Sequence, residues 1–298
     1  MAYSAKIVTD SVSEVGDRLT TMEVTFPRMV LAEFNTHRVF SRNSASSRAI
    51  PVGKQLQRIM DDPFIPVWWG RTQSGMQADH ELVGHDLEQA KAQWLAARDS
   101  AVDHVRRLLE LGLHKQITNR LLEPFMWHTV IVTATEWGNF FALRANPMAQ
   151  PEIRVIAEMM RDAYGESEPV LVRDGEWHLP LIQPEERDGE FEFSEDARKI
   201  SAARCARVSY LTHDGKRDLE ADLKLYDRLA GAGHMSPFEH VATPLSRDPQ
   251  YIRSRRRNGL RREMVLTRIG SNTGNFRGWK QLRKFLPNED DFSKVNNG

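Results

Sequence analysis

The sequence has one cysteine, no long apolar run and no excess of charge of either sign. The single cysteine, Cys205, excludes an internal disulfide and any metal site built from several cysteines. No segment approaches the roughly 20 consecutive apolar residues of a membrane span. The start of the chain lacks the basic and apolar regions of a secretion signal. We therefore expect a soluble, cytoplasmic protein without a membrane partner.

Acidic and basic residues balance at 41 each, so the whole chain carries no net charge that would attract nucleic acid. Several site motifs are also missing. No phosphate loop is present, and the glycines at 231 and 233 lack the third glycine of a dinucleotide fingerprint. His80 and His85 are five residues apart and would not share a helix face, which excludes a zinc-protease helix. Cys205 has no activating base in view, and we expect it to be buried and inert.

Hydrophobic patterning predicts an α+β fold in which a mixed or antiparallel sheet packs with helices. β-Branched residues predict strands at residues 6–9, 20–26 and 126–135. Apolar residues from Leu87 to Leu108 step by three or four, which predicts one long helix or two within residues 79–111, with this stripe packed in the core. Residues 165–193, rich in glycine, proline and acids, are expected to form a hairpin or a long loop. Shorter helices are expected at residues 28–35, 136–144, 151–164, 195–208 and 217–230.

One polar loop stands out. Residues 37–48, HRVFSRNSASSR, contain one histidine, three arginines, one asparagine and four serines, without an acid. Guanidinium groups and hydroxyls suit phosphate oxygens. Composition alone fits a nucleotide-phosphate loop and a solvated polar loop equally well.

The same loop resembles the signature of flavin-dependent thymidylate synthases of the ThyX type, which reads Arg-His-Arg, seven residues, then Ser. Here Thr36, His37 and Arg38 precede a seven-residue stretch and Ser46, and the inner Ser41, Asn43 and Arg48 also fit the signature. Three further segments resemble the same family: ARVSY at 206–210, GHMSPFEH at 233–240 and NFFALRANPMAQPEIR at 139–154. The resemblance implies a ThyX-like fold and one catalytic domain over residues 1–298.

The order of these segments differs from the family's order, because ARVSY and SPFEH precede the Arg-His-Arg loop there and follow it here. Circular permutation explains this, since folds tolerate it where the termini lie close together. The domain would then comprise residues 1–164 with the loop and helices, a linker or hairpin at 165–193, and a permuted flavin-binding segment at 194–298. FRGWKQLRKFL, residues 276–286, resembles a faint second copy of the family's Gln-x-x-Arg-His-Arg helix; the alternative is a plain amphipathic terminal helix.

The resemblance implies roles residue by residue. The flavin contacts would be His37, Arg38, Asn43, Asn139, Ser209, His234, Ser236 and Glu239. The substrate contacts would be Ser46, Ser47, Arg48, Arg120, Arg144, Gln281 and Arg283. Catalysis would fall to Arg144, Ser46 and His37, with Arg144 stabilising charge on the pyrimidine. No metal is implied. Simpler alternatives are a helix-capping role for Arg144 and a surface pair formed by Glu239 and His240.

The implied activity transfers a one-carbon unit from methylenetetrahydrofolate to C5 of a deoxypyrimidine monophosphate, converting dUMP to dTMP, with FAD and NADPH, in a homotetramer with shared active sites. Four positions depart from the family pattern: Glu33, Thr36, Ser44 and Ala49. They leave dCMP as substrate, or a hydroxymethylated product, open. An arginine cluster at 253–268 could attract a folate tail, a nicotinamide cofactor phosphate or nucleic acid, or could be a solvated loop. A non-catalytic nucleotide- or nucleic-acid-binding protein on the same scaffold is a further alternative.

Overall fold

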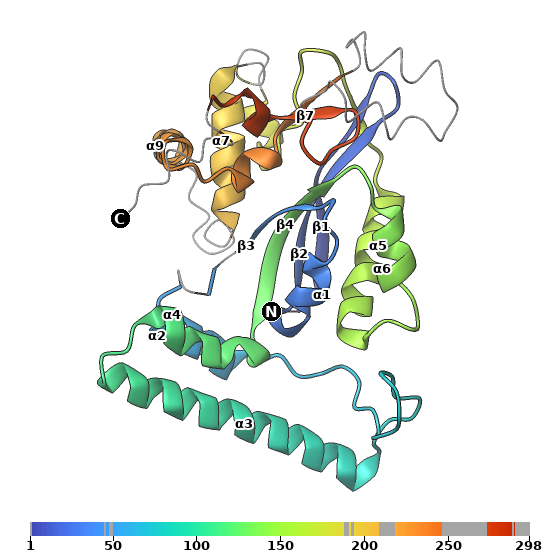
Figure 1. The fold of residues 1–298 in the computed structure, drawn as a ribbon, viewed down its shortest axis with the longest axis vertical. Helices are drawn as coiled ribbons and strands as arrows, with labels where there is room; N and C mark the ends of the chain where they lie inside the picture. Colours follow the sequence, from blue (N-terminus) through green and yellow to red (C-terminus); the bar gives the residue numbers. More distant parts are fainter. Residues whose placement is uncertain are drawn as a thin grey trace.

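The structure is a computed structural model that describes residues 2–44, 46–47, 50–187, 191, 194–208, 218–245, 273–287 and 289. Its centre is a five-stranded sheet with the order β3-β4-β2-β1-β5 (Figure 1). The strands are β1 (Ser4–Ser13), β2 (Arg18–Pro27), β3 (Ser41–Ser44), β4 (Trp127–Ala134) and β5 (Val170–Val172). β1, β2, β4 and β3 pair antiparallel, whereas β5 runs parallel to β1. The mixed sheet confirms the expected α+β class.

The helices surround this sheet, and a small second sheet lies beside it. The α-helices are α1 (Leu31–Asn35), α2 (Val52–Asp61), α3 (Gly84–Glu110), α4 (Lys115–Thr118), α5 (Gly138–Arg144), α6 (Pro151–Glu166), α7 (Glu195–Ala206) and α9 (Leu219–Gly231). The 3-10 turns are η1 (Arg28–Val30), η2 (Asn119–Phe125), η3 (Pro184–Glu186), η4 (Ser236–Glu239) and η5 (Leu282–Phe285). β6 (Ala242–Pro244) and β7 (Trp279–Gln281) form the second sheet. Within these described residues, no helix is long and apolar enough to cross a membrane.

The two faces of the central sheet differ in chemistry. Alternate residues of β2 and β4, such as Met22 and Val132, pack against α5 and α6 in the main core. The opposite face carries threonines, including Thr21 and Thr133, which are also fully buried. The C-terminal part of the chain covers this second face, where Ile131 packs against Cys205 of α7. The sheet therefore separates an apolar layer from a second buried layer that also contains hydroxyl groups.

The long helix α3 lies apart from the sheet (Figure 1). Only Val102 and Val105 on it are fully buried, and they pack with Ile59 of α2 and Leu122 of η2. The predicted long helix is therefore confirmed. The expected core packing of its stripe holds for the C-terminal half, whereas the N-terminal half is half-buried or exposed within the single chain.

The structure decides between two alternatives at residues 165–193 and overturns a prediction at 276–286. Of the hairpin or long loop expected at 165–193, the loop describes the structure better, because β5 pairs in parallel with the distant β1 and most of the other described residues there are turns or irregular. Residues 276–286 form neither a second copy of a family helix nor an amphipathic helix. Trp279 and Gln281 are both fully buried on alternate positions of a strand, β7, which pairs with β6 and continues into η5. The arginine cluster at 253–268 lies outside the described residues.

Candidate active site

The loop that begins at His37 is fixed at three places, the first of which is a contact between His37 and Arg144. His37 is buried, and its ring stacks on Phe40 and meets Phe140 edge-on. Arg144 Nε donates to His37 Nε2 at 3.1 Å. Because that nitrogen accepts, the proton of the neutral ring lies on Nδ1. Burial, followed by the charges of Arg144 and Arg42, lowers the pKa of His37.

Arg144 reaches this position from the last turn of α5. Its Nη2 atom donates to Thr36 Oγ1 at 3.2 Å and to the Glu33 carbonyl at 3.4 Å. The guanidinium therefore binds the end of α1 rather than the carbonyls of its own helix, which argues against the simple capping role. Thr36, which replaces the family's first arginine, is the residue that accepts from Arg144 and donates to the Glu33 carbonyl at 2.7 Å.

The second fixed place joins β3 to the GHMSPFEH segment. The Asn43 amide lies 3.3 Å from His240 Nε2, and with its nitrogen turned toward η4 it donates to the Ser236 carbonyl at 3.1 Å and to Ser236 Oγ at 3.2 Å. Two segments almost 200 residues apart in the chain thus meet at one point, as their resemblance to one family's motifs predicts. The surface-pair interpretation of Glu239 and His240 was wrong, because His240 is fully buried.

Gln281 and Arg283 reinforce the same place. Gln281 Nε2 donates to Ser41 Oγ at 3.1 Å, to the Glu239 carbonyl at 3.3 Å and to Asn275 Oδ1 at 2.6 Å. Arg283 forms an ion pair with Glu239. Both residues therefore contact the loop or η4. They also bond within their own segment, Gln281 to Asn275 and Arg283 to Glu289.

The third fixed place is Glu123, at the far end of the loop. Ser47 Oγ donates to Glu123 Oε1 at 2.7 Å, and Arg120 Nη1 donates to the same oxygen at 2.8 Å. Arg28 Nε lies 2.9 Å from it. Ser46 beside this cluster is exposed. One carboxylate thus gathers two guanidinium groups and a hydroxyl next to the predicted phosphate-binding serines.

The remaining predicted residues divide into two sets. Arg38, Asn139, His234 and Ser236 have exposed side chains. Of these, Arg38, Asn139 and His234 make no described side-chain contact to the three clusters. Arg48 and Ser209 lie outside the described residues.

The sequence analysis did not assign a role to Arg42, whose Nη1 atom donates to the carbonyls of His37 at 3.3 Å and Phe34 at 3.4 Å. Glu123 and Arg28 were also missed, because no spacing rule connects them to the loop. His240, in contrast, is the last residue of the GHMSPFEH motif.

The described residues contain no cluster of side chains suited to a metal ion. Cys205 is fully buried, and burial raises the pKa of its thiol, which disfavours the thiolate that a nucleophilic cysteine requires. The donors around the loop do fit a flavin dinucleotide. Its diphosphate is anionic and suits Arg38, while the amide of Asn43 and the hydroxyl of Ser236 suit the carbonyl and N–H groups of an isoalloxazine ring.

The fold and these three clusters suit an enzyme that holds a nucleotide and a cofactor against one loop. Residues 13–170 match the Thy1 family, described as thymidylate synthase complementing protein. The match spans more than half of the chain, and the chain therefore belongs to this family of ThyX-type, flavin-dependent enzymes, whose members generally use FAD. The match ends before ARVSY and GHMSPFEH, which lie beyond residue 170.

Two solved structures are similar to the chain, and both are of the UMP/dUMP methylase PolB from Streptomyces cacaoi. The one bound with 5-Br UMP has 20% sequence identity and a TM-score of 0.46, over 57% of this chain and 90% of that chain. The one bound with 5-Br dUMP has 18% identity and a TM-score of 0.45, over 57% and 91% of the two chains. No curated protein matches the chain.

Proposed function

We propose that the protein transfers a one-carbon unit from methylenetetrahydrofolate to C5 of a deoxypyrimidine monophosphate, converting dUMP to dTMP, with FAD as cofactor and NADPH as reductant. Family membership supports the reaction class. The observation that carries the proposal is the meeting of Asn43 with Ser236 and His240, because it assembles two separate family-like motifs around one loop.

In this proposal the nucleotide phosphate binds at Ser46, Ser47 and Arg48, with Arg120 beside them. Hydroxyl and guanidinium donors neutralise and orient a phosphate. Arg144 faces the pyrimidine ring and stabilises the negative charge that builds there as C5 becomes nucleophilic. His37 holds the Arg144 guanidinium in place through the 3.1 Å hydrogen bond.

The flavin binds against Asn43, Ser236 and Arg38, with Asn139, Ser209, His234 and Glu239 as further contacts. Reduced flavin, when bound, supplies the hydride and carries the one-carbon unit, which is chemistry that no protein side chain provides. The chain's own residues orient the two ligands. The proposed reaction needs no nucleophile from the protein. The inert Cys205 agrees with this scheme.

A second candidate is the same reaction on dCMP, or a hydroxymethylated product. Thr36 supports this second candidate, because its neutral hydroxyl takes the place of a family arginine and binds Arg144 directly. Loss of one positive charge beside the predicted pyrimidine site changes which ring substituents are favoured. A non-catalytic binding protein remains the alternative outside enzymes.

We further propose that the chain is one catalytic domain, circularly permuted relative to its family, and that it forms a homotetramer with shared sites. Exposed apolar side chains at the end of α3 and on α4, among them Leu111, Leu113 and Ile117, support burial by another subunit. The exposure of Arg38 and His234 supports a site that a second chain completes.

The test is a pair of measurements on the purified full chain. Binding of FAD is followed by the visible absorbance of the oxidised flavin. The loaded protein is then incubated with NADPH, methylenetetrahydrofolate and either dUMP or dCMP, and the products are identified by mass. We expect FAD binding and dTMP from dUMP. A protein that binds no FAD refutes the assignment, and a methylated or hydroxymethylated dCMP selects the second candidate.

A further inference from the structure

A chain of hydrogen bonds runs through the buried polar layer of the sheet, away from Asn43. Its distances are 3.3 Å from Asn43 to His240 Nε2, 2.7 Å from His240 Nδ1 to Thr133, 2.6 Å from Thr133 to Thr21, 2.8 Å from Thr21 to His178 Nε2, and 2.7 Å from His178 Nδ1 to Ser11. Every side chain from His240 to Ser11 is at most 2% exposed. Water therefore does not compete for these bonds.

The chemistry of its members makes the chain behave as one unit. Burial lowers the pKa of both His178 and His240 to about 3, so both rings are neutral and each has one donor and one acceptor. Each threonine hydroxyl has a single proton to donate. Two proton orders use every hydroxyl proton within the chain, and reversing one link then reverses every other link. In each of these orders both histidines carry the proton on the same kind of nitrogen. A mixed order leaves one buried hydroxyl proton without an acceptor in the chain, which is costly.

Asn43 selects between these two orders. The Ser236 carbonyl only accepts, so the amide nitrogen of Asn43 faces it at 3.1 Å. The same nitrogen faces His240 Nε2, which must then be unprotonated. His240 donates from Nδ1 to Thr133, Thr133 donates to Thr21, and Thr21 donates to His178 Nε2. His178 in turn carries its proton on Nδ1 and donates it to Ser11.

We propose that Thr133, Thr21 and His178 are positioning residues that act through His240 to hold the Asn43 amide in one orientation. This orientation leaves Asn43 Oδ1 directed away from Ser236 as an acceptor for a ligand donor. The inference rests on the proposed function only in taking that ligand to be the flavin.

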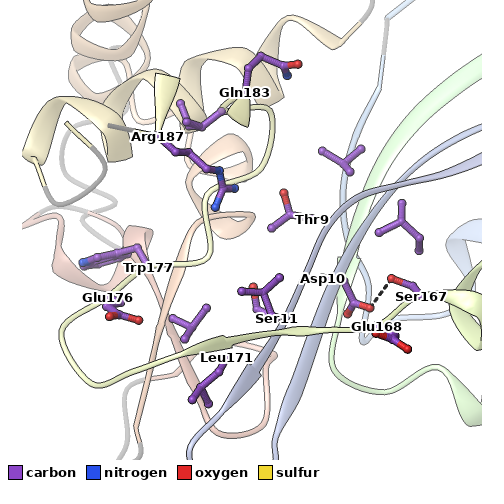
Figure 2. Close-up of a pocket in the computed structure, with 15 residues that line it drawn as sticks. Thr9, Asp10, Ser11, Ser167, Glu168, Leu171, Glu176, Trp177, Gln183 and Arg187 are labelled. Carbon is purple, nitrogen blue, oxygen red and sulfur yellow. Dashed lines mark hydrogen bonds between the residues drawn. The ribbon is translucent and has the colours of Figure 1, made fainter. Parts of the chain in front are cut away.

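The far end of the chain reaches a cavity lined by β1, β5 and the segment that follows β5. Ser11 is among the residues that line this cavity of about 530 Å³, together with Thr9, Trp177 and Arg187 (Figure 2). Because Ser11 accepts from His178, its own hydroxyl proton is available to an acceptor such as a water molecule in the cavity. An acceptor there favours the proton order that Asn43 also favours.

The first test measures the tautomers without requiring activity or cofactor. The ring nitrogens of the full chain are labelled with ¹⁵N at histidine, and their protonation is observed by long-range ¹H–¹⁵N correlation at neutral pH. We expect His178 and His240 both to carry the proton on Nδ1. The Asn43→Asp variant presents only acceptors, and it should convert both rings to the Nε2-protonated form. Different tautomers in the two rings, or a change confined to His240, would overturn the proposal.

The second test uses a matched pair of threonines on the same strands. Thr25 and Thr129 also face each other across β2 and β4, with their hydroxyls 2.9 Å apart, and no described histidine joins them. Thr133→Val breaks the chain, whereas Thr129→Val breaks an equivalent bond outside it. We expect about a fivefold weaker FAD affinity for Thr133→Val, recovery in Thr133→Ser, and less than about a twofold change for Thr129→Val.

Unfolding midpoints of the two valine variants separate positioning from general stability. Equal losses of FAD affinity in Thr133→Val and Thr129→Val would show that the chain has no special role, and so would an unchanged affinity in Thr133→Val. A wild-type protein that binds no FAD would refute the proposed function, and the tautomer measurement would still decide whether the chain exists.

Discussion

Arg144 Nε donates to the Nε2 atom of the buried His37 at 3.1 Å, which joins the last turn of α5 to the start of the candidate active-site loop. A cation bonded to an imidazole requires that ring to be neutral. The bond therefore fixes the charge state of His37 and the direction of Arg144 together. Both residues were expected at the site from their motifs, but their direct contact was not.

Replacing Arg144 by glutamine tests this relationship. Removal of the adjacent positive charge should raise the pKa of His37, because that charge is one of the causes that lower it. Loss of the guanidinium should also reduce kcat about 100-fold if it stabilises charge on the pyrimidine. The pKa is measured by following the His37 ring signals with pH. Arg161→Gln, at an exposed position of α6, is the control and should change neither quantity.

The Glu123 cluster leads to a prediction about nucleotide affinity. Arg120→Gln should raise the KM for dUMP about tenfold, through loss of one charge-assisted bond to the phosphate, with little change in FAD affinity. The exposed Arg106→Gln on α3 removes the same charge elsewhere and should leave KM unchanged. An equal rise of KM in both variants would indicate a general charge effect and contradict a phosphate site at this end of the loop.

Acid should destabilise the fold before the carboxylates titrate. Burial lowers the pKa of His128, His178 and His240 from 6.5 to about 3, so the unfolded chain binds protons that the folded chain does not. This stability is complete above pH 6.5 and falls as the pH drops toward 3. Each histidine contributes up to about 1.4 kcal/mol per pH unit.

Urea unfolding at pH 7.5, 6 and 5 measures this slope. The exposed His85→Gln variant should have the same slope as the wild type. A free energy of unfolding that stays constant from pH 7.5 to 5 would show that these histidines are not held neutral in the folded chain.

A buried ion cluster connects α7 to α9 and should be sensitive to loss of one partner. Arg204 is fully buried and donates from Nε to Asp222 at 3.0 Å, while Glu186 pairs with its other nitrogens. Asp222→Asn should lower the free energy of unfolding by about 3 kcal/mol, because a buried guanidinium loses a charged partner. Glu220→Gln, which breaks an exposed pair with Lys224, should cost less than about 1 kcal/mol.

Much of the fold could be predicted from periodicity, because the strands and most helices carry strong local patterns. The polar face of β2 could not be predicted in this way. Thr21, Glu23 and Thr25 alternate with apolar residues, which is typical of a strand facing water, yet Thr21 is fully buried. The segments that cover it come from residues more than 150 positions later, and local patterns contain no information about such contacts.

The candidate site shows the same limit. Its motifs predicted that His37, Asn43, Arg144 and Ser236 belong to one site, because a family resemblance carries long-range information. The structure shows contacts of His37 with Arg144 and of Asn43 with Ser236. Gln281 bridges Ser41 and Glu239 because it lies on the strand β7. The sequence of this segment had suggested a helix instead of a strand. The circular permutation and the shared tetrameric site stay predictions.

The most direct test of the central claim is tritium release from dUMP labelled at C5. Methylation at C5 replaces the hydrogen there, so the label passes to water only if the reaction proceeds. The purified full chain is supplied with FAD, NADPH and methylenetetrahydrofolate. We expect tritium release that requires FAD, matches the amount of dTMP formed, and falls about 100-fold in Arg144→Gln. A protein loaded with FAD that releases no tritium from dUMP under these conditions would contradict it.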